Sequence, residues 1–192
     1  MGTKFSTRVW VSVVGIASIF FGSKGYADTV ISVADFGLKP DTRENAVAYV
    51  QKAIEACRGK EPVTLVFPEG RYDFWPQYAH EKNYYETNTY DVFPKRLAML
   101  FEGLHNITVD GNGSQFVMHD RIQPITVENC DGVTLKNFSI DWDIPLTAQA
   151  RVTKVGSDFF EIEINVLESP YIIEDGKLVF VGEGWKSALG SM

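Results

Sequence analysis

Two carboxylates that flank an indole are the residues best suited to chemistry: Asp141, Trp142 and Asp143. They follow a segment in which apolar residues such as Val133 and Leu135 alternate with polar ones, a period-two pattern that predicts a strand. Carboxylate oxygens accept hydrogen bonds from hydroxyls, and an aromatic ring packs against an apolar surface. The sequence therefore indicates a polar, aromatic corner at the end of a stiff strand that could hold a sugar, with these three residues as candidate substrate contacts.

The spacing of Asp141 and Asp143 leaves their role open. Residues i and i+2 of an extended segment face the same side, so the two carboxylates would lie together, and Trp142 would face the other side. Carboxyl groups that act on a bond from both sides normally come from different elements. Three interpretations of the aspartates remain open: a structural turn, substrate contacts and catalytic groups. For Trp142 the alternative is packing in the core or between domains.

The strand that leads to these residues resembles an earlier segment. Residues 100–111 align with residues 126–137 at an offset of 26 positions, with Glu102 on Glu128. A repeat of this length, made of short strands and polar turns, indicates coils of a parallel β-helix, which bury their apolar faces by stacking. Asn137 interrupts the alternation, and Asn tolerates a left-handed backbone, so we expect a sharp turn there. The alternative is a pair of ordinary hairpins with similar turns.

Before the repeat, the chain predicts strands and one amphipathic helix. Apolar residues recur at helical spacing within residues 47–57 and stop before Gly59, and Asp41 and Glu44 have the spacing of a capping box. Strands are expected at residues 29–36, 63–67 and 71–74. An open end of a β-helix would expose apolar core and unpaired strand edges, so we expect the helix to cap the N-terminal end of the solenoid.

Residues 75–96 interrupt the strand pattern with a segment rich in aromatic residues. The rings are those of Trp75, Tyr78, Tyr84, Tyr85, Tyr90 and Phe93. Long loops on a rigid scaffold often carry function, and aromatic faces suit the apolar faces of sugars. We expect packing against the solenoid to explain most of these rings, with a substrate cleft lined by at least one of them as the alternative.

Histidines and cysteines indicate neither a metal site nor a required disulfide. His80, His105 and His119 are scattered, without the spacing of a zinc site, and no cofactor is implied. Cys57 falls on the apolar face of the expected helix, and Cys130 falls on an apolar position of the repeat. We expect both to be buried as small hydrophobic residues, with a bridge between them as the alternative.

Residues 1–27 have the pattern of a secretory signal peptide. Lys4 and Arg8 precede an apolar run over residues 9–21, and small residues precede Asp28. We expect export to the periplasm, the cell surface or the medium, with an uncleaved membrane anchor as the alternative. Removal of residues 1–27 would change the formal net charge from −7 to −10, because three basic residues and no acidic residue are lost. An acidic chain does not attract nucleic acid or anionic membranes, so a neutral ligand is expected.

After Pro145 the pattern changes to short strands joined by tight polar turns. Strands are expected at residues 147–154, 159–166, 171–173 and 178–181. They indicate antiparallel hairpins and the start of a small β-barrel or sandwich. Three regions are therefore expected: the signal peptide at residues 1–27, the cap and first coils of the β-helix at residues 28–145, and a barrel-like insertion at residues 146–192. Because solenoids need terminal caps, we expect the chain to be the N-terminal part of a longer protein.

Several motifs together resemble the entry of pectate-lyase-like right-handed β-helix proteins. They are Val-Ala-Asp-Phe-Gly at residues 33–37, the helical segment at 50–54, Val-Phe-Pro-Glu-Gly-Arg-Tyr at 66–72 and Asn-Ile-Thr-Val-Asp-Gly-Asn-Gly at 106–113. More narrowly, residues 116–120 through residues 137–143, with the barrel-like segment that follows, resemble glycoside hydrolase family 110. The resemblance covers nearly all of the chain after residue 27.

The resemblance implies an all-β protein, a right-handed parallel β-helix with β-barrel insertions. It implies an exo-acting glycosidase that removes terminal α-1,3-linked galactose with inversion from blood group B structures, and in one subfamily from linear glycans. The family's catalytic carboxylates are expected beyond Met192, so none can be assigned in this sequence. Two alternatives stay open: a polygalacturonase- or lyase-type β-helix enzyme, and a β-helix that binds glycans without catalysis. The motifs typical of polygalacturonases are absent from these 192 residues.

Overall fold

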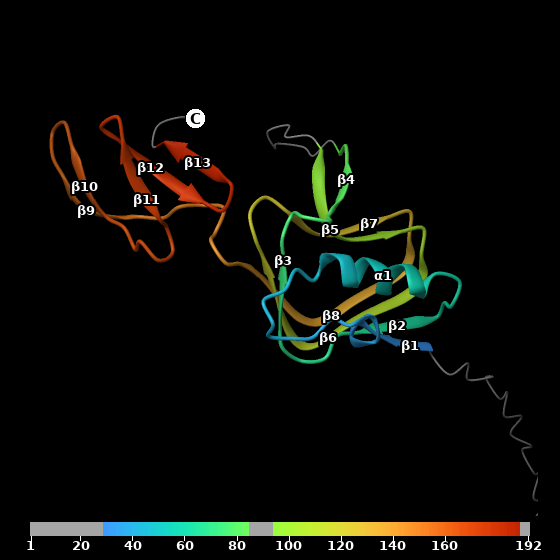
Figure 1. The fold of residues 1–192 in the computed structure, drawn as a ribbon. Coiled ribbons are helices and arrows are strands. Elements are labelled where there is room, and N and C mark those ends of the chain that lie inside the picture. The colour runs from blue at the N-terminus through green and yellow to red at the C-terminus, as the bar shows by residue number, and fades with distance from the viewer. Residues whose placement is uncertain (1–28, 85–93, 189–192) are drawn as a thin grey trace, which may run out of the picture.

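The structure is a computed structural model that describes residues 29–84 and 94–188 (Figure 1). The predicted signal peptide, residues 1–27, lies outside the described residues and stays a prediction. Within the two described stretches, no helix is both long enough and apolar enough to cross a membrane.

The described chain consists mostly of β-strands, which confirms the all-β class. Its elements in chain order are β1 (Thr29–Ser32), η1 (Val33–Phe36, a 3-10 helix), α1 (Val47–Cys57), β2 (Val63–Val66), β3 (Arg71–Phe74), β4 (His80–Lys82), β5 (Lys95–Glu102), β6 (His105–Met118), β7 (Gln123–Glu128), β8 (Asp131–Trp142), β9 (Arg151–Val155), β10 (Phe160–Glu163), β11 (Tyr171–Glu174), β12 (Lys177–Gly182) and β13 (Trp185–Ala188).

Two sheets built largely of parallel strands enclose the core. In the first sheet the long strand β6 pairs in parallel with β2, β3 and β8, and β1 pairs in parallel with β2. In the second sheet β5 pairs in parallel with β7, and β4 is antiparallel to β5. Apolar side chains from both sheets pack in one cluster, among them Met99 and Phe101 of β5 and Ile107 and Phe116 of β6. Their burial excludes water and stabilises the facing sheets.

The pairing of these strands follows the 26-residue repeat. Glu102 pairs with Glu128 across β5 and β7, and Ile107 pairs with Val133 across β6 and β8, both at an offset of 26 positions. Beyond a register shift, Phe116 pairs with Ile140 at an offset of 24 positions. The predicted repeat is confirmed, and the alternative of ordinary hairpins is wrong for these strands because they run in parallel. Parallel pairing is one requirement of a β-helix, but it does not by itself establish the complete coil.

The register shift coincides with a bend at Asn137. Its φ is 60°, which confirms the predicted left-handed turn. On the neighbouring strand, a Cβ atom at Gly111 would lie 2.5 Å from the Cβ atom of Phe138. Glycine at this position therefore allows β6 and β8 to approach each other where both strands bend.

Helix α1 contacts β1, β2 and β5, so it lies at the N-terminal end of the two sheets (Figure 1). Its inward face is fully buried and consists of Val47, Val50, Ala53, Ile54 and Cys57. The predicted capping box is wrong, because Asp41 has a φ of 62° and its Oδ1 accepts the Arg71 amide at 2.9 Å. The first amide of the helix, that of Val47, instead donates to Asn45 Oδ1 at 3.1 Å.

The first predicted strand is shorter than residues 29–36. A capping box forms locally: Ser32 Oγ accepts the Ala34 amide, and the Asp35 carboxylate accepts the Ser32 amide. Such local bonds compete with strand pairing, and the chain turns into the 3-10 helix instead. The two cysteines are not bridged; Cys57 is fully buried, and the half-buried Cys130 packs against the core.

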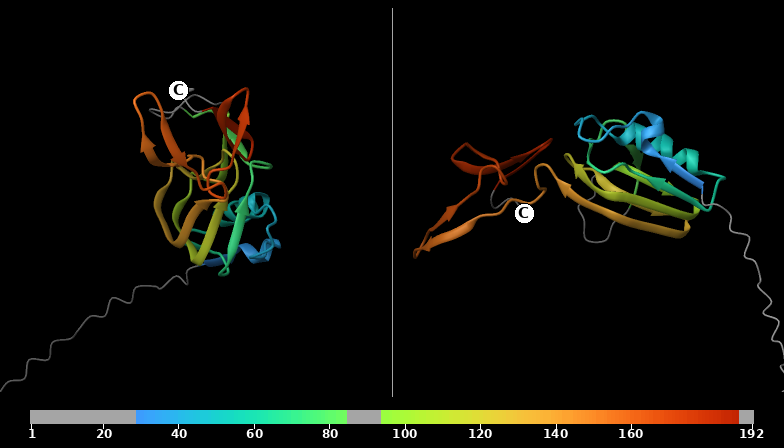
Figure 2. Two further views of the ribbon diagram at one scale, coloured as in Figure 1. Left: turned by 90° about the vertical axis from the view of Figure 1, so that its left-hand side faces the viewer. Right: turned by 90° about the horizontal axis from the view of Figure 1, so that it is seen from below.

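The antiparallel strands β9 to β13 form a lobe at one end of the parallel sheets (Figure 2). β9 pairs with β10, and β12 pairs with both β11 and β13. The predicted hairpins are confirmed, and β13 is an additional strand. Within residues 146–188 the two small sheets do not close into a barrel, and several apolar side chains are exposed, including Phe160, Leu167 and Ile173. The predicted domain boundaries stay predictions.

Candidate functional site

The three residues predicted as substrate contacts lie at and just beyond the end of β8. Asp141 is exposed, and its Oδ1 accepts the Trp142 amide at 2.8 Å. Trp142 packs against the core, and its Nε1 donates to the Asp120 carbonyl at 3.2 Å. The indole therefore serves packing, the alternative kept open for it. Whether Asp141 and Asp143 contact a substrate stays a prediction.

Asp143 takes part in a polar network that joins distant parts of the chain. Arg71 Nη2 lies 2.7 Å from Asp143 Oδ1 and 2.6 Å from Asp73 Oδ1. Asp73 Oδ1 also lies 2.9 Å from His119 Nε2, and His119 Nδ1 lies 2.8 Å from Glu183 Oε1. The network therefore runs from the turn between β12 and β13 through the end of β6 to β3 and the residue after β8.

The centre of this network is buried. The side chains of Asp73 and His119 are 0% and 4% exposed. Burial opposes the ionisation of Asp73, but hydrogen bonds from Arg71 and His119 outweigh it and hold the pKa of Asp73 below its ordinary value. The hydrogen bond to Asp73 raises the pKa of Arg71 in turn. Both ring nitrogens of His119 face carboxylate oxygens, so the ring bridges Asp73 and Glu183.

Asp73, His119 and Asp143 also form a group that could hold a metal ion. One potential ligand atom from each lies within 4.8 Å of the others. The scattered histidine positions gave no sign of this group, because its members are brought together only by the fold. Arg71 already donates to both carboxylates, so a cation would have to displace a guanidinium. The residues present therefore fit a hydrogen-bonded network better than a metal site.

A stacked pair connects the network to the aromatic segment. The Trp75 indole lies on the His119 ring with centroids 3.8 Å apart and planes 9° apart. Two side-chain amides, one from helix α1 and one from just before it, hold the backbone that follows Trp75. Asn45 Nδ2 donates to the Gln77 carbonyl, and Gln51 Nε2 donates to the Tyr78 carbonyl, both at 2.9 Å. The start of the aromatic segment is thus fixed at several points.

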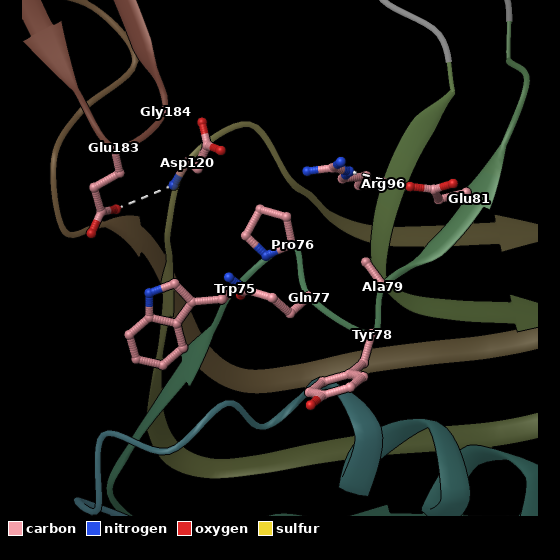
Figure 3. Close-up of a pocket in the computed structure, with 10 residues that line it drawn as sticks. All are labelled: Trp75, Pro76, Gln77, Tyr78, Ala79, Glu81, Arg96, Asp120, Glu183 and Gly184. Carbon is pink, nitrogen blue, oxygen red and sulfur yellow. Dashed lines mark hydrogen bonds and ion pairs between the residues drawn. The ribbon is translucent and has the colours of Figure 1, made fainter.

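A pocket of about 470 Å³ lies between this segment and the β12–β13 turn (Figure 3). It is lined by Trp75, Pro76, Gln77, Tyr78, Ala79, Glu81, Arg96, Asp120, Glu183 and Gly184. Two rings of the aromatic segment line this pocket, whereas the sequence left open whether any ring would line a cleft.

A second polar cluster lies on the other sheet, where the repeat places two glutamates side by side. Glu102 and Glu128 pair on neighbouring strands, and like charges at such positions repel. Lys82 Nζ lies between them, 2.8 Å from Glu102 Oε1 and 2.6 Å from Glu128 Oε2. The Tyr84 hydroxyl also bonds to Glu128. The hydrogen bond from Lys82 is the main cause that lowers the pKa of Glu128.

The sequence did not indicate most of the polar network, nor the three pocket residues outside the aromatic segment: Asp120, Glu183 and Gly184. Arg71 and Asp73 offered one signal, because opposite charges at positions i and i+2 of a strand share a face. Asp120 and Glu183 offered none, since their neighbours in the fold are far away in the chain.

The chain matches the family model described as GLAA-B beta-barrel domain I over residues 148–192. Alpha-1,3-galactosidase B from Bacteroides thetaiotaomicron is 62% identical over 163 residues, which are 85% of this chain and 26% of that protein. Alpha-1,3-galactosidase A from Shewanella woodyi is 37% identical over 158 residues, 82% of this chain and 26% of that protein. Alpha-1,3-galactosidase B from Phocaeicola vulgatus is 36% identical over 184 residues, 94% of this chain and 29% of that protein.

These matches show that the chain is a homologue of glycoside hydrolases. More narrowly, its relatives are alpha-1,3-galactosidases, which confirms the resemblance found in the sequence. The chain spans about a quarter of the length of the curated relatives that it matches.

Proposed function

We propose that the protein containing this chain is an exo-acting glycosidase that hydrolyses terminal α-1,3-linked galactose from glycans, with inversion at the anomeric carbon. The observation that carries this proposal is the 62% identity over 85% of the chain to a relative named Alpha-1,3-galactosidase B. The signal-like pattern of residues 1–27 supports export of the protein.

The catalytic carboxylates are proposed to lie outside these 192 residues. An inverting glycosidase uses two carboxyl groups about 6.5–9.5 Å apart, one protonating the leaving oxygen and one activating water. Asp143 is held in an ion pair with Arg71, and Asp73 is held between Arg71 and His119. The hydrogen bonds from Arg71 and His119 hold the pKa of Asp73 below its ordinary value, which makes Asp73 a poor proton donor. The part of the relatives not spanned by this chain is long enough to hold the catalytic pair.

The fold proposed for the intact protein is a right-handed parallel β-helix in which a further coil covers β7 and β8. Val127 is 46% exposed, whereas its partner one repeat earlier, Phe101, is fully buried. Ile140 is 38% exposed, whereas its partner Phe116 is fully buried. Repeats bury their apolar faces against the next repeat, so these exposed positions mark the face on which the following coil would stack.

Galactose release tests the activity. The intact protein and the 192-residue chain are incubated separately with a Galα1-3Gal disaccharide and with a branched blood group B oligosaccharide. We expect release by the intact protein alone, with β-galactose as the first anomer seen by proton NMR. No release from either substrate by the intact protein would overturn the proposal, and α-galactose as the first anomer would overturn inversion.

Two variants of the intact protein test where catalysis occurs. Asp141→Asn and Asp143→Asn are expected to change KM while kcat stays within about tenfold, because a substrate contact acts in binding. Removal of a general acid or base typically lowers the rate by about 10²–10⁴-fold. A loss of that size in either variant, with intact folding by circular dichroism, would place the catalytic carboxylates in this chain.

A further inference from the structure

We propose that the pocket between the aromatic segment and the β12–β13 turn binds a neutral hexopyranose unit of the glycan, with Tyr78 as the stacking platform and Asp120 as the acceptor of a sugar hydroxyl. The choice of a galactose-type sugar rests on the proposed function. The position of the site rests on the geometry alone.

The size and composition of the pocket suit a sugar. Its volume of about 470 Å³ lies within the range of about 300–1,000 Å³ that small-molecule sites occupy. It combines two aromatic rings with several carboxylates and one guanidinium (Figure 3). A pyranose has an apolar C–H face and a rim of hydroxyls, so it needs both kinds of group.

Tyr78 is held in an unusual conformation that keeps its ring available. Its φ is 68°, a left-handed backbone that bulky residues rarely adopt. The residue is 74% exposed, although its carbonyl is fixed by Gln51 at 2.9 Å. Backbone strain of this kind persists only where surrounding contacts enforce it. The contacts from Asn45 and Gln51 therefore position a ring that the core does not use.

Asp120 supplies a polar group that lacks a partner. Its Oδ1 is buried and forms no hydrogen bond with the residues that the structure describes. A buried polar atom without a partner is costly, and a sugar hydroxyl that reaches Oδ1 as the covering β12–β13 turn shifts would satisfy it. The carboxylate is held close to the β12–β13 turn, because the Asp120 amide donates to Glu183 Oε2 at 3.2 Å and a Cβ at Gly184 would lie 2.4 Å from Asp120 Oδ2.

The charge of the lining selects against acidic sugars. Three carboxylates line the pocket, those of Glu81, Asp120 and Glu183, against one guanidinium. That guanidinium, of Arg96, is paired with Glu81 at 3.4 Å. A uronic acid would bring a further negative charge close to this set, so a neutral hexose is favoured.

Photoaffinity labelling of the intact protein tests the site independently of catalysis. A methyl α-galactoside carrying a diazirine is irradiated with the protein, and labelled tryptic peptides are mapped by mass spectrometry. Cleavage after Arg71 and Lys82 isolates residues 72–82, which contain both pocket rings. We expect this peptide to be labelled, with protection by excess methyl α-galactoside and little protection by galacturonic acid at equal concentration.

Variants connect the label to the proposed contacts. Tyr78→Ala and Asp120→Asn are expected to raise the concentration of methyl α-galactoside that halves labelling by about threefold to tenfold, the size of an aromatic contact or a hydrogen bond. Tyr171→Ala removes another exposed tyrosine that does not line the pocket, so it should leave that concentration unchanged. Circular dichroism of each variant checks that it is folded.

The outcomes separate this inference from the proposed function. If peptide 72–82 stays unlabelled while other peptides are labelled and protected, the pocket proposal is wrong and the glycosidase proposal stands. If peptide 72–82 is labelled and protected but no galactose is released from any substrate, the pocket proposal stands and the glycosidase proposal fails. Equal protection by galacturonic acid, or unchanged protection in Tyr78→Ala and Asp120→Asn, would overturn the assignment of the ligand and its contacts.

Discussion

Replacement of Asp73 by asparagine should weaken the packing of β3 against β6 strongly. Asparagine keeps the shape of the side chain and leaves no cavity, so the change isolates the charge and its hydrogen bonds. Asp73 is fully buried and accepts bonds from Arg71 and His119. Removal of one partner of a buried ion pair typically costs about 3–5 kcal/mol. Arg71 is 21% exposed and keeps Asp143, so we expect the lower end, about 3 kcal/mol.

Hydrogen–deuterium exchange of the intact protein measures this loss locally, through the amides of β3 and the second half of β6. A loss of about 3 kcal/mol of local stability corresponds to a roughly hundredfold larger population of the locally unfolded state, and so to roughly hundredfold faster exchange of these amides. Glu163→Gln is the matched control, because it breaks an ion pair with Arg151 whose side chains are 77% and 62% exposed. Such pairs contribute at most about 1 kcal/mol, so exchange of β3 and β6 should not change in that variant.

The difference in the free energy of local opening between wild type and Asp73→Asn should depend on pH. The folded-state pKa of Asp73 lies below its unfolded value of 3.8. The stability that its ionisation contributes is therefore fully present above that value and is lost as the pH falls through the folded-state pKa. The part of the opening free energy that the ionised Asp73 contributes should shrink below about pH 4. A difference under about 0.5 kcal/mol at pH 7, or one that persists unchanged at pH 2, would refute the reasoning.

Three further outcomes are expected. Lys82→Met leaves two facing glutamates without their cation, so the thermal midpoint of the intact protein should fall by differential scanning calorimetry, and added salt should recover part of the loss. Gly111→Ala places a methyl group 2.5 Å from the Cβ of Phe138 and should cost about 1–3 kcal/mol in urea unfolding; an unchanged midpoint would contradict the close approach of β6 and β8. Burial raises the pKa of Cys57 to about 11, so at pH 8 iodoacetamide should modify Cys57 far more slowly than the half-buried Cys130, with equal rates in urea; equal rates in the folded protein would contradict the described burial.

The repeat could be predicted because stacking places like residues on like. Glu102 and Glu128 occupy equivalent positions of the repeat. Because parallel strands pair residue by residue, the two glutamates lie directly beside each other on neighbouring strands. Asn137 carried its own backbone signal. The hairpins after Pro145 were predictable for a different reason: their turns and their alternation of apolar and polar residues are local. The helix was predictable from its apolar spacing.

The contacts that build the network and the pocket could not be predicted, because they depend on positions far apart in the chain. Arg71 and Asp143 are separated by 72 residues, and His119 and Glu183 by 64. The wrong capping box has a related cause. Asp41 had suitable spacing from Glu44, but the fold supplied a stronger partner in the backbone of Arg71. Spacing along the chain indicates local partners and contains no information on tertiary competitors.

The two connections from the first sheet to the parallel strands of the second sheet differ greatly in length, because the earlier connection includes the antiparallel strand β4. Twenty residues separate Phe74 at the end of β3 from Lys95 at the start of β5, whereas four separate Met118 at the end of β6 from Gln123 at the start of β7. Both connections join strands that pair in register with those of the next repeat. The parallel ladders therefore tolerate sixteen extra residues at one corner without a change in stacking. The longer connection therefore changes what this corner presents, with Trp75 and Tyr78 at the pocket and Lys82 between the two facing glutamates, while the parallel ladders on either side keep their pairing.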